Sequence, residues 1–204
     1  MEDFLQYNQN FIVELSGEND WINIHLSTLF LELQDIYTSI YIFRTVDCEW
    51  DKRVQEGEVP EYSVVRNVLY EALVYRVILG LGKIFANHKE YSLSKTVNQI
   101  EQIFKNNREV KNIIDEIRQK FDGSPMIPKI RKFRDKFFAH LDRENVLLYF
   151  RTDPTSAMKD IDFDEIEEWL VLIGKLYKVC FGAEVPRKSQ MPSKDDIVHT
   201  FFWR

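Results

Sequence analysis

The chain has 204 residues, of which 45% are hydrophobic and 29% are charged, and its net charge is −6. This composition excludes a disordered chain and argues against an integral membrane protein, whereas the length suits one domain with one core. The negative charge excludes a surface that coats nucleic acid indiscriminately, so any contact with nucleic acid must be local.

The N-terminal half predicts an arm and two long helices. Residues 1–17 are expected to form a short helix or arm. Apolar residues at the helical period predict a first long helix over about 19–44, and a loop rich in Glu and Gly is expected at 54–60. A second helix is predicted over 62–85, and its middle is apolar on nearly all sides. That pattern predicts the central buried element of the fold.

Three further helices are predicted in the next part of the chain. Ser92 or Ser94 can cap a helix that runs to about residue 105, and residues 109–121 supply another. Pro128 is tolerated in the first turn of a helix, so a helix is expected to include it and to extend to about residue 144.

The C-terminal quarter predicts a short extended piece followed by two helices. Residues 145–150 have a strand-like composition. Asp162 or Asp164 is expected to open a long helix that ends at Phe181-Gly182, and the acidic run there is interpreted as a helix start rather than a calcium loop. Ser193 can cap a last short helix, whose aromatic end is expected to pack on the core of the chain.

These elements predict an all-α helical bundle with long antiparallel core helices. A single domain is expected over residues 1–204, with an arm at 1–17, the bundle core at 18–183 and a tail with a short helix at 184–204. Glu71 and Arg76 interrupt the one long apolar run, which argues against a membrane span.

The start of the chain and its two cysteines bear on location and cofactors. The start is acidic and lacks the features of a secretory signal, so a cytoplasmic protein without membrane association is expected. Cys48 and Cys180 stand in no metal-binding spacing, and both are predicted to be buried thiols. We therefore expect neither a metal site nor a cofactor.

The helix predicted over residues 126–144 carries the strongest functional signal. On a helical wheel its apolar residues share one broad arc. Arg134 falls inside this arc, and His140 falls on its edge. An arginine on an apolar face needs an anionic or carbonyl partner to offset its desolvation. Something anionic, in the fold or in a ligand, is expected to meet Arg134.

The same helix is basic although the whole protein is acidic. Residues 129–143 contain six cations and two carboxylates, a net charge of +4. Several of the cations lie near the helix N-terminus, where the macrodipole disfavours them. A local patch that faces phosphate groups would account for them. The predicted RNA-binding residues are Lys129, Arg131, Lys132, Lys136 and Arg143.

At these residues the chain resembles the HEPN superfamily, in which four to six residues stand between an Arg and a His on one helix of an all-helical bundle. Here five residues separate Arg134 from His140. The Ala-His-Leu-Asp sequence at 139–142, and the upstream helix at 70–85 that a Ser-Leu-Ser turn follows, are most similar to the abortive-infection U-type branch.

The resemblance implies a metal-independent endoribonuclease of the toxin or phage-defence kind. Its site would form where two copies of the motif helix meet in a homodimer, and an antitoxin protein could be a further partner. His140 could transfer protons at the ribose 2′-hydroxyl or the leaving oxygen, and Arg134 could hold the phosphate. The two side chains lie about 120° apart on an ideal helix. One chain therefore presents them divergently, and two chains could make them converge.

Asp135 stands where the family most often has Asn, directly after the motif arginine. We include Asp135 among the catalytic candidates, because an aspartate could orient a histidine or cap a neighbouring backbone group. It could also repel RNA.

Other interpretations of the same residues stay open. The chain could be a catalytically silent helical module that binds RNA or a partner protein, or a plain helical interaction domain in which the motif is coincidental. Arg134 could form a buried ion pair with Glu71, which would not exclude catalysis. His140 could be a core residue at an apolar edge, and the basic helix face could be merely solvated.

Overall fold

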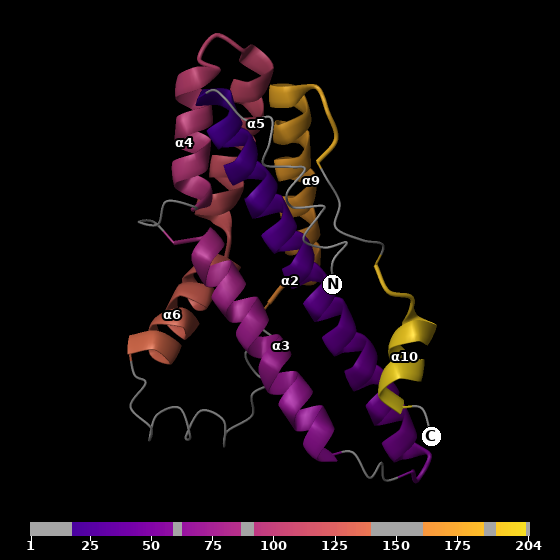
Figure 1. Ribbon diagram of the computed structural model, residues 1–204. Helices are drawn as coiled ribbons and strands as arrows, with labels where there is room; N and C mark the ends of the chain where they lie inside the picture. The colour runs from indigo at the N-terminus through magenta and orange to yellow at the C-terminus, as the bar shows by residue number, and fades with distance from the viewer. Residues whose placement is uncertain (1–17, 59–62, 87–91, 140–160, 186–190, 203–204) are drawn as a thin grey trace.

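The computed structural model describes residues 18–58, 63–86, 92–139, 161–185 and 191–202. Within these ranges the chain forms seven helices and no strand (Figure 1). The helices are α2 (Glu18–Gln55), α3 (Ser63–Ile84), α4 (Leu93–Ile103), α5 (Arg108–Gly123), α6 (Met126–Ala139), α9 (Phe163–Phe181) and α10 (Lys194–Phe202). The predicted all-α bundle is therefore confirmed. The arm at 1–17 and the extended piece at 145–150 lie outside the described residues.

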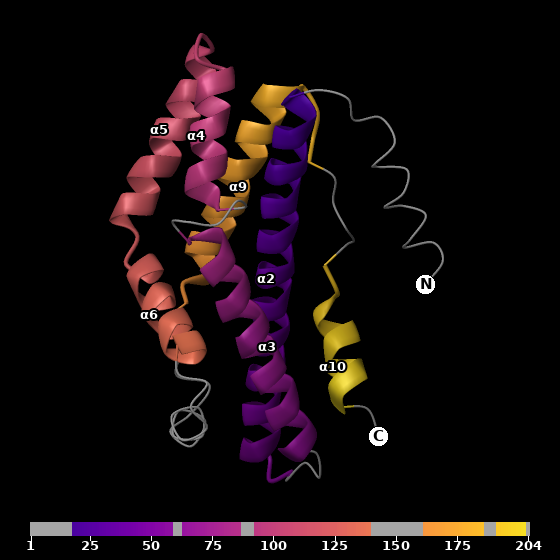
Figure 2. The same ribbon diagram turned by 60° about the vertical axis from the view of Figure 1, so that its left-hand side comes forward.

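Helix α2 is the central element of the bundle. It packs against α3, α4, α9 and α10, and both views show it running nearly the full height of the molecule (Figures 1 and 2). Its direction is opposite to those of α3 and α9, which confirms the predicted antiparallel core. Its buried stripe repeats at intervals of three and four residues, as helix packing requires. The stripe consists of Ile22, Leu26, Leu29, Leu33, Ile36, Ile40 and Phe43.

Our prediction that the second helix is the central buried element was wrong. Helix α3 packs mainly against α2 and α6, and part of its surface faces solvent. Val68 is 62% exposed and Tyr75 is 36% exposed on that surface. Hydrophobicity on all sides therefore did not identify the central helix. Helix α2 is central because it is long enough, at 38 residues, to contact four neighbours.

Helix α2 also extends eleven residues beyond its predicted end at residue 44. No glycine or proline interrupts residues 45–55, so the helical hydrogen bonds continue. Val46 is buried, and Asp47 accepts a hydrogen bond of 2.6 Å from the hydroxyl of Tyr70 on α3. The helix ends just before Gly57, whose φ of +82° suits glycine. Contacts with α3 thus stabilise the additional turns.

The extension of α2 corrects our prediction for Cys48, which is exposed rather than buried. Cys48 lies on a turn of α2 whose core-facing position is occupied by Val46. Cys180 on α9 is partly buried, and burial raises the pKa of its thiol to about 12. The two cysteines therefore differ in their environments.

Local sequence signals determine the ends of the shorter helices. The hydroxyl of Ser92, and not that of Ser94, caps α4 by accepting from the amide of Lys95. Asp162, rather than Asp164, caps α9, which confirms that the acidic run is a helix start. Gly182 ends α9 in a left-handed conformation with φ of +68°.

The predicted packing of the C-terminal tail is confirmed where the structure describes it. Phe202 at the end of α10 is buried against the core, and the guanidinium of Arg53 lies 4.8 Å from the centre of its ring. Helix α10 packs on α2 through such contacts. None of the helices described is both long and apolar enough to cross a lipid bilayer.

Candidate functional site

The motif residues lie on α6, which begins directly after α5. The hydroxyl of Ser124 accepts hydrogen bonds from the amides of Met126 and Ile127, both 3.2 Å long, and so caps the helix. Pro128 lies in the first turn, as predicted. Met126, Ile127 and Ile130 are buried. Helix α6 therefore has one apolar face that joins the core, and it packs beside the C-terminal half of α3 (Figure 1).

Arg134 lies on the face of α6 that meets α3, as the helical wheel predicted. Its aliphatic carbons occupy the space beside Gly82: a Cβ atom placed on Gly82 would lie 3.0 Å from Cδ and 3.1 Å from Cγ of Arg134. The side chain of Arg134 is partly buried there. A cation is thus held at the α3–α6 seam with part of its surface open to solvent.

Arg131 lies one helical turn before Arg134 and has a structural contact that we did not predict. Its Nε and Nη2 atoms donate hydrogen bonds of 3.3 Å and 3.2 Å to the carbonyl oxygen of Phe85, directly after the end of α3. The guanidinium also lies 5.4 Å from the ring centre of Phe121. These contacts connect α6 to both α3 and α5.

Phe121 and Phe85 belong to an aromatic cluster beneath Arg131. The buried ring of Trp169 on α9 lies 5.4 Å from the ring of Phe85 and 6.4 Å from that of Phe121. Aromatic pairs at such distances stabilise a core beyond the area that they bury. This aromatic cluster therefore joins the end of α3 to α5 and α9, and Arg131 of α6 contacts its edge.

The structure describes some of the predicted site residues and not others. Lys129 and Lys132 are exposed on α6, as a patch that faces a ligand would require. Only the backbone of Asp135 and Lys136 is described, within α6, and His140 and Arg143 lie outside the described residues. The side chain of Glu71, the alternative partner of Arg134, also lies outside them. The joint role of Arg134 and His140 in one site therefore stays a prediction.

Two properties of Arg134 suit it to binding a phosphate group. A guanidinium is planar and stays protonated, so it can hold a phosphate through two parallel hydrogen bonds. Contact of its stem with α3 restricts its motion and so lowers the entropy lost when it binds an anion. The seam thus presents a positive group suited to a phosphate oxyanion.

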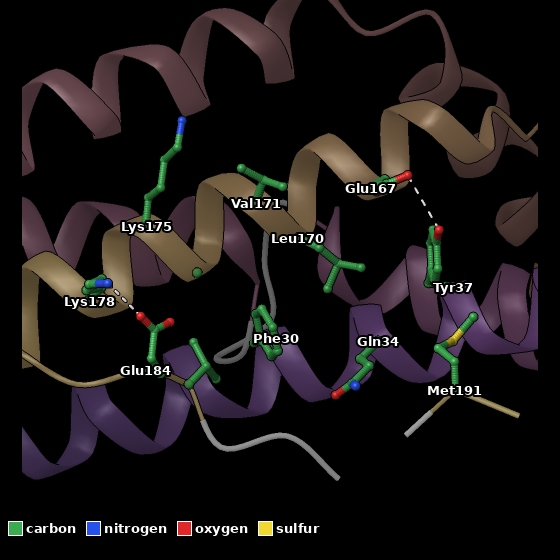
Figure 3. Close-up of a pocket in the computed structure, with 12 residues that line it drawn as sticks. Phe30, Gln34, Tyr37, Glu167, Leu170, Val171, Lys175, Lys178, Glu184 and Met191 are labelled. Atoms are coloured by element: carbon green, nitrogen blue, oxygen red, sulfur yellow. Dashed lines mark hydrogen bonds and ion pairs between the residues drawn. The ribbon is translucent and has the colours of Figure 1, made fainter. Parts of the chain in front are cut away.

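The structure also contains a groove that the sequence did not reveal, with a volume of about 830 Å³. It lies between α2, α9 and the residues Glu184, Val185 and Met191, and Figure 3 shows its lining side chains. Apolar residues such as Phe30 and Leu170 line it. An ion pair of 2.6 Å joins Lys178 to Glu184 at one end. None of the α6 residues whose side chains the structure describes lines this groove.

Two features could have been recognised from the sequence but were not. Gly82 is an isolated glycine within a helical apolar pattern, a signal that often has a packing reason. Ser124 is a capping residue just before Pro125, a common start for a helix. The groove has no such signal, because its walls come from distant parts of the chain.

Comparison with known proteins identifies the family. No curated protein matches the chain, and no solved structure does. The sequence model of the HEPN_AbiU2 family, described as AbiU2, matches residues 11–178. This match covers most of the chain, including the whole segment from Lys129 to Arg143. The chain therefore belongs to the HEPN_AbiU2 family.

Proposed function

We propose that the chain is a metal-independent endoribonuclease of the toxin or phage-defence kind, active as a homodimer. The observation that carries the proposal is the position of Arg134. It projects from α6 onto α3 at a partly open seam, and it begins the Arg–His spacing within the segment that the family match covers. A purely structural arginine would not need the additional cations of residues 129–143.

The proposed reaction is a transesterification within the RNA backbone. The imidazole of His140 takes the proton from a ribose 2′-hydroxyl, and the 2′-oxygen then attacks the adjacent phosphorus. The bond from phosphorus to the 5′-oxygen breaks, and this oxygen gains a proton from an imidazolium. The guanidinium of Arg134 stabilises the charge that develops on the phosphate oxygens. The products are a 2′,3′-cyclic phosphate and a 5′-hydroxyl.

A homodimer is proposed because Arg134 and His140 would lie about 120° apart on an ideal helix, so that one chain would present them divergently. A second copy can bring the missing group to the same phosphate. Three exposed residues lie on α3, the helix against which the aliphatic stem of Arg134 packs. They are Val68, Ala72 and Tyr75. Their spacing of four and three places them on one face, as in helix pairs. This face is our proposed contact between the two copies.

The basic face of α6 supplies the proposed attraction for RNA. Lys129 and Lys132 are exposed, and Lys136 and Arg143 belong to the same segment. Arg131 is also a candidate, although two of its donor groups already bind the carbonyl of Phe85. Because contacts with phosphate release counterions, binding should weaken as the salt concentration rises. An acidic antitoxin protein could neutralise the same cations.

Cleavage of total cellular RNA by the purified protein, with a metal chelator present, tests the proposal. Wild type should produce 2′,3′-cyclic phosphate ends, whereas Arg134→Ala and His140→Ala should each lower the rate by at least about 100-fold. Lys95→Ala removes an exposed cation from α4 and serves as the matched control, with wild-type activity expected.

Two outcomes would contradict the ribonuclease proposal. One is intact RNA after incubation with a folded, dimeric wild-type protein; the catalytically silent RNA- or protein-binding module would then be the better account. The other is cleavage that Arg134→Ala and His140→Ala leave unchanged, since a contaminating nuclease would then be responsible.

A further inference from the structure

Helix α3 contains two glycines near its C-terminus, Gly80 and Gly82. Glycine is unfavourable inside a helix because it loses more backbone freedom on folding than any other residue. Neither glycine has the positive φ that would require it. The remaining physical reason for a glycine at each position is a lack of space for a side chain.

The two glycines make room for different neighbours. A Cβ atom on Gly80 would lie 2.7 Å from Cδ1 of Ile36, so Gly80 allows α2 to approach α3 closely. A Cβ atom on Gly82 would instead lie 3.0 Å from Cδ and 3.1 Å from Cγ of Arg134. Carbon atoms normally approach to about 3.5–4.0 Å. Gly82 thus leaves room for the aliphatic stem of the motif arginine.

A second contact one turn away fixes how α6 lies on α3. Arg131 binds the carbonyl of Phe85, and Arg134 lies on Gly82. Arg131 and Arg134 are three residues apart on α6, their partners Phe85 and Gly82 are three residues apart at the end of α3, and the two pairs run in opposite chain directions. The Arg131 contact therefore restricts the rotation of α6, while Gly82 permits the close approach of Arg134.

We propose that Gly82 is a positioning residue for Arg134. Because it has no side chain, the stem of Arg134 lies flat against α3, and this contact determines where the guanidinium meets the RNA phosphate. This inference rests on the proposed ribonuclease function. A methyl group at residue 82 would push the stem by several tenths of an ångström, and the guanidinium at its end would move with it.

A double-mutant cycle on thermal unfolding tests the contact itself, without any RNA. Alanine favours a helix more than glycine does, so Gly82→Ala should raise the unfolding midpoint wherever the methyl group fits. We expect a larger rise in the Arg134→Ala background, where the stem is absent, than in the wild-type background. Equal shifts in the two backgrounds would show that residues 82 and 134 are not coupled.

Initial rates of total-RNA cleavage test the positioning role. At saturating RNA, Gly82→Ala should lower the rate about tenfold, because a small misplacement of a catalytic group is costly. The RNA concentration that gives half the maximal rate should change less than about twofold, because the exposed cations that attract RNA remain in place.

Two other glycine variants, one on α3 and one on α5, are the matched controls. Gly80→Ala crowds Ile36 and should lower the unfolding midpoint, but the folded protein should keep its wild-type rate. Gly123→Ala meets no atom within 4 Å, so it should not lower the unfolding midpoint and should leave the rate unchanged. An equal loss of rate in Gly80→Ala would show that any loosening of α3 matters, which would overturn the positioning role.

The two proposals can fail separately. If wild type does not cleave RNA, the ribonuclease function fails and the positioning role fails with it, whereas the unfolding cycle still decides whether Gly82 seats Arg134. If wild type cleaves RNA and Gly82→Ala cleaves it equally fast, only the positioning role is overturned.

Discussion

The contacts of a side chain in this protein depend on its neighbours in space as well as on its residue type, as two arginines of α6 show. Arg131 and Arg134 have the same chemistry and lie one turn apart. Arg131 binds a backbone carbonyl at the end of α3, whereas Arg134 lies over a glycine with part of its surface open. Two residues of the same type, one turn apart on α6, therefore have different surroundings.

The two cysteines should differ strongly in reactivity, because the thiolate is the reactive form. Burial raises the pKa of Cys180 to about 12, so almost none of it is ionised at pH 8, while Cys48 is exposed. We expect iodoacetamide to label Cys48 at least about tenfold faster than Cys180 in the native protein. Peptide mass spectrometry over time measures both rates, and Cys48→Ser shows the remaining rate of Cys180.

The same shift affects stability at alkaline pH. The unfolded thiol loses its proton near pH 8.5, about where a free cysteine titrates, whereas the native thiol keeps its proton up to about pH 12. The native state then binds more protons than the unfolded state, so stability decreases as the pH rises through this window. Below the pKa of the unfolded thiol, the contribution of Cys180 to the free energy of unfolding is fully present.

Rapid, pH-independent labelling of Cys180 in the folded protein would contradict its burial.

At the scale of the helices, polar contacts determine how the apolar faces of two helices are aligned. Arg76 interrupts the apolar run of α3, and the structure explains it. Its guanidinium binds Glu32 on α2 at 2.6 Å and Asp35 at 3.2 Å. The hydrogen bond that Arg76 donates to Glu32, opposed by burial, raises the pKa of Arg76. The pair is partly solvated, so it specifies the alignment of α2 with α3 more than it stabilises the fold.

The stability that the contact between α3 and α6 provides should depend on Arg131 more than on its exposed neighbours. Arg131→Ala removes two charge-assisted hydrogen bonds and the contact with Phe121, so we expect the free energy of unfolding to fall by about 1–3 kcal/mol. Lys132→Ala, at an exposed position on the same helix, should change it by less than about 0.5 kcal/mol. Urea denaturation followed by circular dichroism provides both values. Equal effects of the two substitutions would contradict the structural role of Arg131.

For the whole molecule, the proposed function requires two chains. The described helices bury one common core around α2, and α6 lies at the side of this core beside α3 (Figure 2). An accessible face of α3 next to the motif helix is where a second copy would complete the site. The groove between α2 and α9 belongs to a different part of the molecule.

Val68→Glu should weaken the proposed dimer. Val68 is 62% exposed, so the substitution should leave the fold intact while it places two like charges in the contact. We expect the dissociation constant to rise by at least about tenfold, together with a loss of RNA cleavage. The matched control is Val171→Glu on α9, at a residue that is 51% exposed. Analytical ultracentrifugation measures both variants, and a wild-type monomer at micromolar concentration would contradict the dimer.

Much of the fold could be predicted because the relevant signals are local. Periodic apolar residues predicted the helices. Candidate caps narrowed the start of α4 to Ser92 or Ser94 and that of α9 to Asp162 or Asp164, and the structure shows Ser92 and Asp162. The position of Arg134 on the apolar arc of α6 followed from the same period, and the structure confirms that this face meets α3. The Arg–His spacing indicated the family, which the comparison with known proteins establishes independently.

Only the tertiary structure could decide which helix is central and which faces are covered. Both long helices have enough apolar surface for the centre, and the packing of distant segments made α2 the common partner. The exposure of Cys48, the contact of Arg131 with Phe85 and the room that Gly82 leaves for Arg134 have the same origin. The sequence by itself determined the helices and the family motif, because both depend on neighbouring residues. The surroundings of each side chain depend on residues far apart in the chain, so packing alone determined them.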